Sequence, residues 1–188
     1  MKRELLIFLL AIAPFVACAD TYKIDAAHSR IAFSVHHLLG TARGEFHKFS
    51  GTIEVDPKQP QQSSVNVTIE VGSIDTQIKK RDTHLLSADF FDAAKFPQIT
   101  FRSRSAKQTS ATSADIAGDF TMHGATKPIT LHVKLVSPPD GPRTRWSVTT
   151  DPIHRKDFGL MFSGTAETMS GIGQDVTTAI EIEAVRAN

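Results

Sequence analysis

The chain has 188 residues, among them 21 basic and 20 acidic ones, so its formal net charge is +1 at pH 7. This length suits one domain with a sizeable core, and near-neutrality argues against a protein that holds nucleic acid by counterion release. Ten of the twelve phenylalanines follow residue 19, beside one tyrosine and one tryptophan. That bias indicates an apolar interior, either a packed core or a pocket.

The first 19 residues predict a cleaved export signal. Lys2 and Arg3 form a basic start, an apolar run follows over residues 5–16, and Ala17-Cys18-Ala19 fits the A-x-A cleavage rule. The apolar run is shorter than the roughly 20 residues that a membrane-spanning helix needs. We therefore expect Asp20 to begin the mature protein, and we expect that protein in the periplasm.

Cys18 is the single cysteine of the chain, and two interpretations of it stay open. It is either the middle residue of the cleavage site or the lipid-accepting cysteine of a bacterial lipoprotein signal. The second interpretation fits less well because Phe15 stands where a leucine is usual. Cleavage after Ala19 would leave a neutral chain without cysteine, which excludes disulfides and thiol catalysis.

Alternation with a period of two dominates the rest of the chain and predicts β-strands. The clearest runs are 31–37, 65–71, 129–135 and 180–183. Weaker runs are 52–56, 98–105, 115–123 and 145–150. Turn-forming residues separate them, as at 56–58, 109–113 and 137–141. One apolar and one polar face per strand is typical of an antiparallel sheet with one wet side, so we expect an all-β sandwich or barrel in a single domain.

Residues 79–91 break this alternation, since Leu85, Leu86, Phe90 and Phe91 stand among charged residues. The pattern predicts a short helix or lid over a barrel mouth. Either Asp82 or Thr83 is expected to cap its start, and Pro97 is expected to close the region.

The same segment carries a resemblance to a known family. Residues 81–92, RDTHLLSADFFD, and 95–101, KFPQITF, closely resemble the signature stretch of the YceI-like proteins. Three other places agree in the family's order. They are His28-Ser29 before the strand at 31–35, the region 44–52, and residues 118–128.

The resemblance spans almost all of residues 20–187 and implies a lipocalin-like antiparallel barrel of about eight strands. It also implies a periplasmic protein that binds long polyisoprenoids, isoprenoid quinones or other long-chain amphiphiles. No catalytic motif comes with the family.

An eight-stranded barrel is just wide enough for packed side chains or one slim ligand, and each buried methylene contributes about 0.8 kcal/mol. The residues expected to face the interior are Phe33, Val35, Phe49, Ile53, Phe101, Phe120 and Leu131. Those expected at the mouth are Leu85, Leu86, Phe90 and Phe91. An ordinary packed core would use the same residues, so both interpretations stay open.

Three polar residues accompany the mouth residues. Arg81, Asp82 and His84 are candidates to meet a polar head group such as a quinone ring or a pyrophosphate. The alternative is an ion pair that fixes the segment to the barrel rim. The basic run of Lys79, Lys80 and Arg81 either attracts a phosphate or an anionic membrane face, or is simply solvated.

We expect neither a metal site nor a catalytic site. His36 and His37 are adjacent, so they point to opposite sides of a strand, although His47 could join one of them across a hairpin. No further cluster with ligand spacing accompanies them. The chain has no G-x-S-x-G motif, and Ser163 stands in Phe-Ser-Gly-Thr.

The sequence therefore predicts a binding protein without cofactor that holds an isoprenoid-type lipid, a polyprenol, polyprenyl phosphate or quinone, and that does not bind nucleic acid. One alternative is an enzyme that acts on a lipid or quinone through His84 and Asp82. Another is a stress-related structural module with a filled barrel. A homodimer is compatible with the first function, because a long ligand can project from a barrel mouth.

Overall fold

A computed structural model describes residues 19–38, 40–137, 142–161 and 171–187. The predicted export segment up to Cys18, residues 138–141 of the predicted turn at 137–141, and the Phe162–Thr165 motif lie outside these residues. Twelve strands are assigned within them: β1 (Asp20–Ile24), β2 (Arg30–His37), β3 (Gly40–Phe46), β4 (Phe49–Val55), β5 (Ser64–Glu70), β6 (Ile74–Asp75), β7 (Gln98–Ser110), β8 (Ser113–Met122), β9 (Ala125–Ser137), β10 (Arg143–Thr150), β11 (Ile153–His154) and β12 (Ile172–Arg186). The helical segments are α1 (Lys79–Leu86) and the short 3₁₀ turns η1 (Ala26–His28), η2 (Pro60–Gln62), η3 (Val71–Ser73) and η4 (Arg155–Phe158). None of the helices described is long and apolar enough to cross a membrane.

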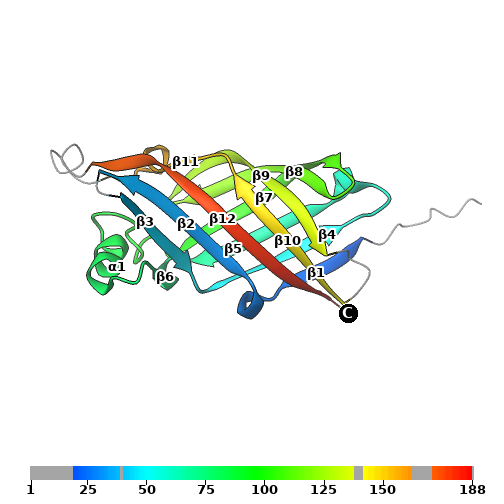
Figure 1. The fold of residues 1–188 in the computed structure, drawn as a ribbon, viewed down its shortest axis with the longest axis horizontal. Coiled ribbons are helices and arrows are strands. Elements are labelled where there is room, and N and C mark those ends of the chain that lie inside the picture. Colours follow the sequence, from blue (N-terminus) through cyan, green and yellow to red (C-terminus); the bar gives the residue numbers. More distant parts are fainter. Residues whose placement is uncertain (1–18, 39, 138–141, 162–170, 188) are drawn as a thin grey trace, which may run out of the picture.

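The strands close into one antiparallel barrel, which Figure 1 shows from the side. The pairing order runs β1-β4-β5-β7-β8-β9-β10-β12, and β12 pairs back onto β1. β1 and β2 both pair with β12, so together they fill one strand position of the wall. β3, which pairs with β2, shares the next position with β4. β6, which pairs with β3, shares the position after that with β5. Eight strand positions therefore form a closed wall, and the predicted lipocalin-like barrel of about eight strands is confirmed. The short helical segment predicted near 79–91 is confirmed as α1 and the turns that follow it.

A kink divides the first strand position into β1 and β2, and Ser29 holds it. The Ser29 hydroxyl donates to the Asp25 carbonyl at 2.7 Å and accepts from the Glu183 amide at 2.9 Å. The Asp25 carboxylate accepts from the amide of Ala27 and from the His28 ring, which fixes η1. The His28-Ser29 pair of the family-like pattern thus has a structural role, because it lets β12 change partner from β2 to β1.

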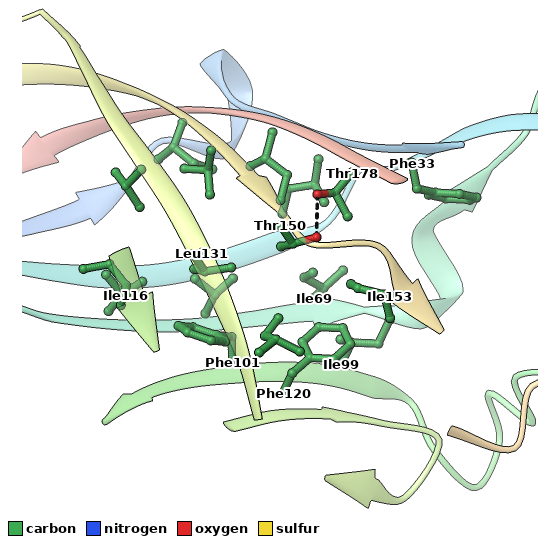
Figure 2. Close-up of a pocket in the computed structure, with 18 of the residues that line it drawn as sticks. Phe33, Ile69, Ile99, Phe101, Ile116, Phe120, Leu131, Thr150, Ile153 and Thr178 are labelled. Atoms are coloured by element: carbon green, nitrogen blue, oxygen red, sulfur yellow. Dashed lines mark hydrogen bonds between the residues drawn. The ribbon is translucent and has the colours of Figure 1, made fainter. Parts of the chain in front are cut away.

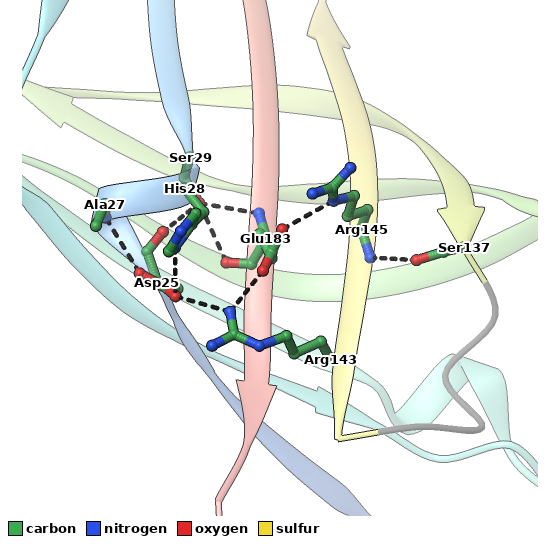
Figure 3. A network of polar contacts seen from close by, with 8 residues as sticks. All are labelled: Asp25, Ala27, His28, Ser29, Ser137, Arg143, Arg145 and Glu183. Carbon is green, nitrogen blue, oxygen red and sulfur yellow. Dashed lines mark hydrogen bonds and ion pairs between the residues drawn. The ribbon is translucent and has the colours of Figure 1, made fainter.

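The same corner holds a buried carboxylate, drawn in Figure 3. The Glu183 side chain is only 6% exposed and accepts from Arg143 at 2.6 Å and from Arg145 at 2.8 Å. Arg143 also reaches the Asp25 carboxylate at 3.0 Å. The network therefore ties β10, β12 and η1 together where the barrel closes.

This network predicts a pH-dependent stability. Arg143 and then Arg145 hold the pKa of Glu183 below its ordinary value, and His28 and then Arg143 lower that of Asp25. A carboxylate whose pKa is lower in the folded than in the unfolded state contributes fully to stability at a pH above its unfolded-state pKa, which is about 4.3 for glutamate. This contribution is lost as the pH falls through the folded-state pKa. Glu183→Gln is thus expected to be less stable than wild type at pH 7, with the two curves converging below about pH 4.

Urea unfolding at a series of pH values measures this effect. The control is Glu181→Gln, an exposed residue on the same strand, which is expected to follow the wild-type curve. A constant gap between Glu183→Gln and wild type down to the lowest pH would contradict the ionic role of Glu183.

Close packing across the wall depends on Gly118 of β8. A Cβ atom at this position would lie 2.4 Å from the Arg102 carbonyl oxygen and 2.6 Å from Cζ of Phe101. Gly118→Ala is therefore expected to cost about 1–3 kcal/mol of unfolding free energy, as overpacking does. At Gly72 an added Cβ meets nothing within 4 Å, so Gly72→Ala is the matched control. Equal denaturation midpoints for the two variants would show that the wall yields at Gly118.

Candidate functional site

The barrel encloses a cavity of about 630 Å³. Inward side chains follow every second residue of the wall, which is the pattern that the pleat of a strand imposes. On β9 the lining residues are Ile129, Leu131, Val133 and Leu135. On β12 they are Ile172, Val176, Thr178, Ile180 and Ile182. The cavity therefore follows the strands along the barrel instead of forming a shallow surface pocket.

The cavity reaches both ends of the barrel. At one end it is lined by exposed His84 of α1, and at the other by exposed Thr112 in the turn between β7 and β8. Figure 1 shows α1 and the β7–β8 turn at opposite ends of the molecule. Asp56, after β4, and Gln108 add polar groups at the end away from α1. The middle, drawn in Figure 2, is mainly apolar.

The residues predicted to face the interior lie largely on this cavity. Nine of the eleven line it: Phe33, Val35, Ile53, Leu85, Phe90, Phe91, Phe101, Phe120 and Leu131. Phe49 and Leu86 do not line it. Phe49 is buried in the main hydrophobic cluster, and Leu86 is partly buried against that cluster. Contact of these residues with a ligand stays a prediction.

Several lining residues had no strong sequence signal. Ile153 and Leu160 lie in and after the short β11–η4 segment, where no alternation could be followed. Ala42 of β3 lines the cavity, but the strand was not predicted because two of its inner positions, Ala42 and Gly44, hold small residues. Thr150 and Thr178 line the cavity with polar side chains, which hid their inward orientation from a hydrophobic pattern.

At the α1 end, Thr76 organises the predicted head-group residues. Arg81 donates from Nε to the Thr76 hydroxyl at 2.7 Å and from a terminal nitrogen to the Thr76 carbonyl at 2.8 Å. The Asp82 carboxylate accepts from the Thr76 amide at 2.9 Å. Arg81 and His84 line the cavity, whereas Asp82 does not. The two charged residues thus fix the start of α1 to Thr76, which directly follows β6. Their contact with a head group stays a prediction.

The predicted cap of this helix was wrong. Ile78 is the N-cap residue and makes no capping hydrogen bond with its side chain. Asp82 lies in the first turn with its carboxylate turned to Thr76, and the Thr83 hydroxyl donates back to the Lys79 carbonyl. The start of α1 is therefore held by local bonds to Thr76, two residues before the N-cap, in place of a capping side chain.

A buried arginine supports the wall at the same end. Arg155 is 2% exposed and lines the cavity. Its guanidinium donates to the carbonyls of Leu160 at 2.6 Å, Gly173 at 2.9 Å and Ile172 at 3.2 Å. These bonds join η4 to the beginning of β12, which are separated in the sequence.

The described residues contain one group of three potential metal ligands, and its chemistry does not suit a cation. Ligand atoms of Asp25, His28 and Glu183 lie within 4.8 Å of one another. However, Arg143 already bridges the two carboxylates, so their charge is compensated. The histidines considered as ligands in the sequence have other partners, since His36 bonds Thr41 and His47 bonds Asp75, each at 3.1 Å.

Fold and cavity together define the class of protein: a closed, lipocalin-like antiparallel barrel with an apolar internal cavity. Residues 22–184 match the family model of the YceI-like domain, and the chain belongs to that family. It is 38% identical to Protein YceI of Salmonella arizonae over 195 residues, which cover 99% of each chain. Protein YceI of Salmonella newport gives the same values.

Solved structures agree on the fold. Burkholderia cenocepacia BcnA superposes with a TM-score of 0.79 at 25% identity, covering 86% of this chain and 99% of the other. The YceI protein of Campylobacter jejuni gives a TM-score of 0.67 at 26% identity, with coverages of 81% and 89%. A polyisoprenoid binding domain from Saccharophagus degradans gives 0.63 at 19% identity, with coverages of 88% and 98%, and this likeness concerns the fold alone.

Proposed function

We propose that this protein binds one long isoprenoid-type lipid inside its barrel and carries or sequesters it. The observation that carries the proposal is the apolar cavity of about 630 Å³ that runs between the two ends of the barrel. A ligand in such a cavity gains about 0.8 kcal/mol for each buried methylene, so a long chain binds tightly with few polar contacts. The cavity also argues against a structural module with a filled barrel.

The length of the cavity suits a membrane lipid. Its lining on β12 runs from Ile172 to Ile182. At about 3.3 Å per residue and a strand tilt of about 40°, this stretch spans roughly 25 Å along the barrel axis. The hydrocarbon core of a bilayer is about 30 Å thick. A chain that leaves a membrane would therefore find apolar surroundings of similar length here.

Two further observations support binding over catalysis. Asp82, one of the two residues considered for catalysis, is bonded to Thr76 and does not line the cavity, so it does not form a catalytic pair with His84 there. The Saccharophagus degradans domain with the same fold is described as polyisoprenoid binding. If the wild-type protein turned over a lipid or quinone and the His84→Ala variant did not, an enzyme would be favoured instead.

Native mass spectrometry, combined with organic extraction of the protein from its own cells, tests the proposal. We expect a bound species whose fragments differ by isoprene units. A fatty acid or amide would retain the carrier role and overturn the isoprenoid assignment. An empty barrel, together with no thermal shift on adding polyprenols, would overturn the binding function.

The proposal includes a location in the periplasm, supported by the predicted export segment. Mass analysis of the mature protein decides between the two interpretations of its amino terminus. A chain that begins at Asp20 supports cleavage after Ala19. An acylated Cys18 at the first position would instead show a lipoprotein, and an unprocessed chain would contradict export.

A further inference from the structure

Two threonines interrupt the apolar middle of the cavity wall. Thr150 ends β10 and Thr178 lies on β12, and both line the cavity. Their hydroxyl oxygens lie 3.0 Å apart and share a hydrogen bond, which Figure 2 shows on the inner side of the wall. Valine has nearly the same shape as threonine and would cover this wall without a polar group. The pair is therefore a feature that simple packing of an apolar chain does not require.

The hydrogen bond between the threonines leaves capacity unused. Each hydroxyl offers one donor and two acceptor sites, and the shared bond uses one donor and one acceptor. Within the described part of the chain, neither hydroxyl has another hydrogen-bond partner. One hydroxyl hydrogen is thus available on a wall that faces the cavity, and a polar ligand atom can accept it.

The surroundings of the pair select what can bind there. Ile69, Ile153 and Phe33 lie near it in Figure 2, and Phe33 is the cross-strand neighbour of Thr178. Thr76 and Phe33 approach each other over Gly44, since a Cβ there would be within 3 Å of both. Phe33 therefore separates the pair from the rim group of Thr76 and Arg81. The wall inside Phe33 is mainly apolar, and the guanidinium of buried Arg155 is engaged by the carbonyls of Leu160, Ile172 and Gly173. A charged group that passed Phe33 would therefore lose its water, whereas a neutral oxygen would lose less and gain a hydrogen bond.

We propose that Thr150 and Thr178 form a hydrogen-bonding subsite for an uncharged carbonyl oxygen of the ligand. This inference rests on the proposed lipid-binding function and specifies its ligand class. The ligand is a chain with a neutral carbonyl head, of the polyprenyl quinone type, and its head group enters the barrel below the rim. A polyprenyl phosphate would instead keep its charge outside Phe33 and make no use of the pair.

The test compares a polyprenyl quinone with a polyprenyl hydrocarbon of the same chain length that lacks the ring. The variant is Thr150→Val/Thr178→Val, which removes both hydroxyls together and leaves no polar partner orphaned. We expect its affinity for the quinone to fall about fivefold, which corresponds to about 1 kcal/mol, the usual contribution of one hydrogen bond. Its affinity for the hydrocarbon is expected to stay equal or to increase.

Thr177→Val is the matched control, because Thr177 is the exposed neighbour of Thr178 on the outer face of β12. Thermal unfolding without ligand verifies that each variant folds. Unchanged quinone affinity in the folded double variant would overturn the subsite and leave the lipid-binding function intact. A wild-type protein that binds neither probe would overturn both. A phosphate-headed lipid that loses the same factor in the double variant would overturn the assignment of a neutral carbonyl head.

Discussion

Replacing Ala42 by tryptophan is expected to abolish binding of a long prenyl chain. Ala42 lies on β3, two residues from the strand's first residue, faces Val35 across the β2–β3 pair, and lines the cavity. An indole at this position would fill the section that a chain entering beside α1 has to cross. Each isoprene unit kept out forfeits about 4 kcal/mol, or roughly a thousandfold in affinity, at about 0.8 kcal/mol per carbon.

A second block separates an obstructed entry from a shortened cavity. Ala114 lines the same cavity on β8, near the β7–β8 turn at the opposite end. Ala114→Trp is expected to bind short prenyl chains as wild type does and to lose affinity for long ones. Ala42→Trp is expected to lose both.

Titration of a series of prenyl chain lengths, by quenching of intrinsic fluorescence or by calorimetry, measures the difference. Arg43→Trp adds the same ring at an exposed position beside Ala42 and serves as the control. Wild-type affinity for long chains in Ala42→Trp would show that the ligand does not occupy this part of the barrel. Wild-type binding of short chains in both variants, with equal losses for long chains, would instead show that the chain can enter from either end.

The fold could be predicted because most strands alternate strictly. The runs at 31–35 and 129–135 put their apolar residues on the cavity side, as a period of two requires. β3 was missed, because its inner positions include Ala42 and Gly44. Gly44 has no side chain to signal burial, yet the Phe33 ring needs that space, since a Cβ there would lie 2.5 Å from it. A search for alternating hydrophobic residues cannot detect a position where a residue is needed because it is small.

The site could be predicted less completely. Some of its polar residues bond partners that are distant in the sequence, and others bond partners whose residue type gives no sign of the bond. Arg81 and Asp82 were identified as rim residues, but Thr76 carries no signal that would pair it with both. Thr150 and Thr178 belong to different strands and meet only when β10 pairs with β12. For the threonine pair the register of the barrel brings the groups together, whereas Thr76, Arg81 and Asp82 are neighbours in the sequence whose side-chain types alone do not indicate the bonds that they form.

Arg155 illustrates the same limit, and its replacement has the largest expected effect on stability. Arg155→Met keeps a long unbranched side chain in the buried position but removes all donors to the carbonyls of Leu160, Ile172 and Gly173. A buried acceptor left without a donor costs about 1–3 kcal/mol, so the variant is expected to lose about 3 kcal/mol or more of unfolding free energy.

Arg155→Lys is the informative companion, because an ammonium retains the charge but lacks the planar fork that reaches several carbonyls at once. We expect a midpoint of urea unfolding between those of wild type and Arg155→Met. Since Leu160 and Ile172 line the cavity, loss of these bonds would also loosen the wall beside α1, and bound lipid should dissociate faster from Arg155→Met. If Arg155→Met unfolded at the same urea concentration as wild type, water would have to replace the guanidinium as the donor to these carbonyls. This end of the barrel would then admit water, although the rest of the cavity is apolar.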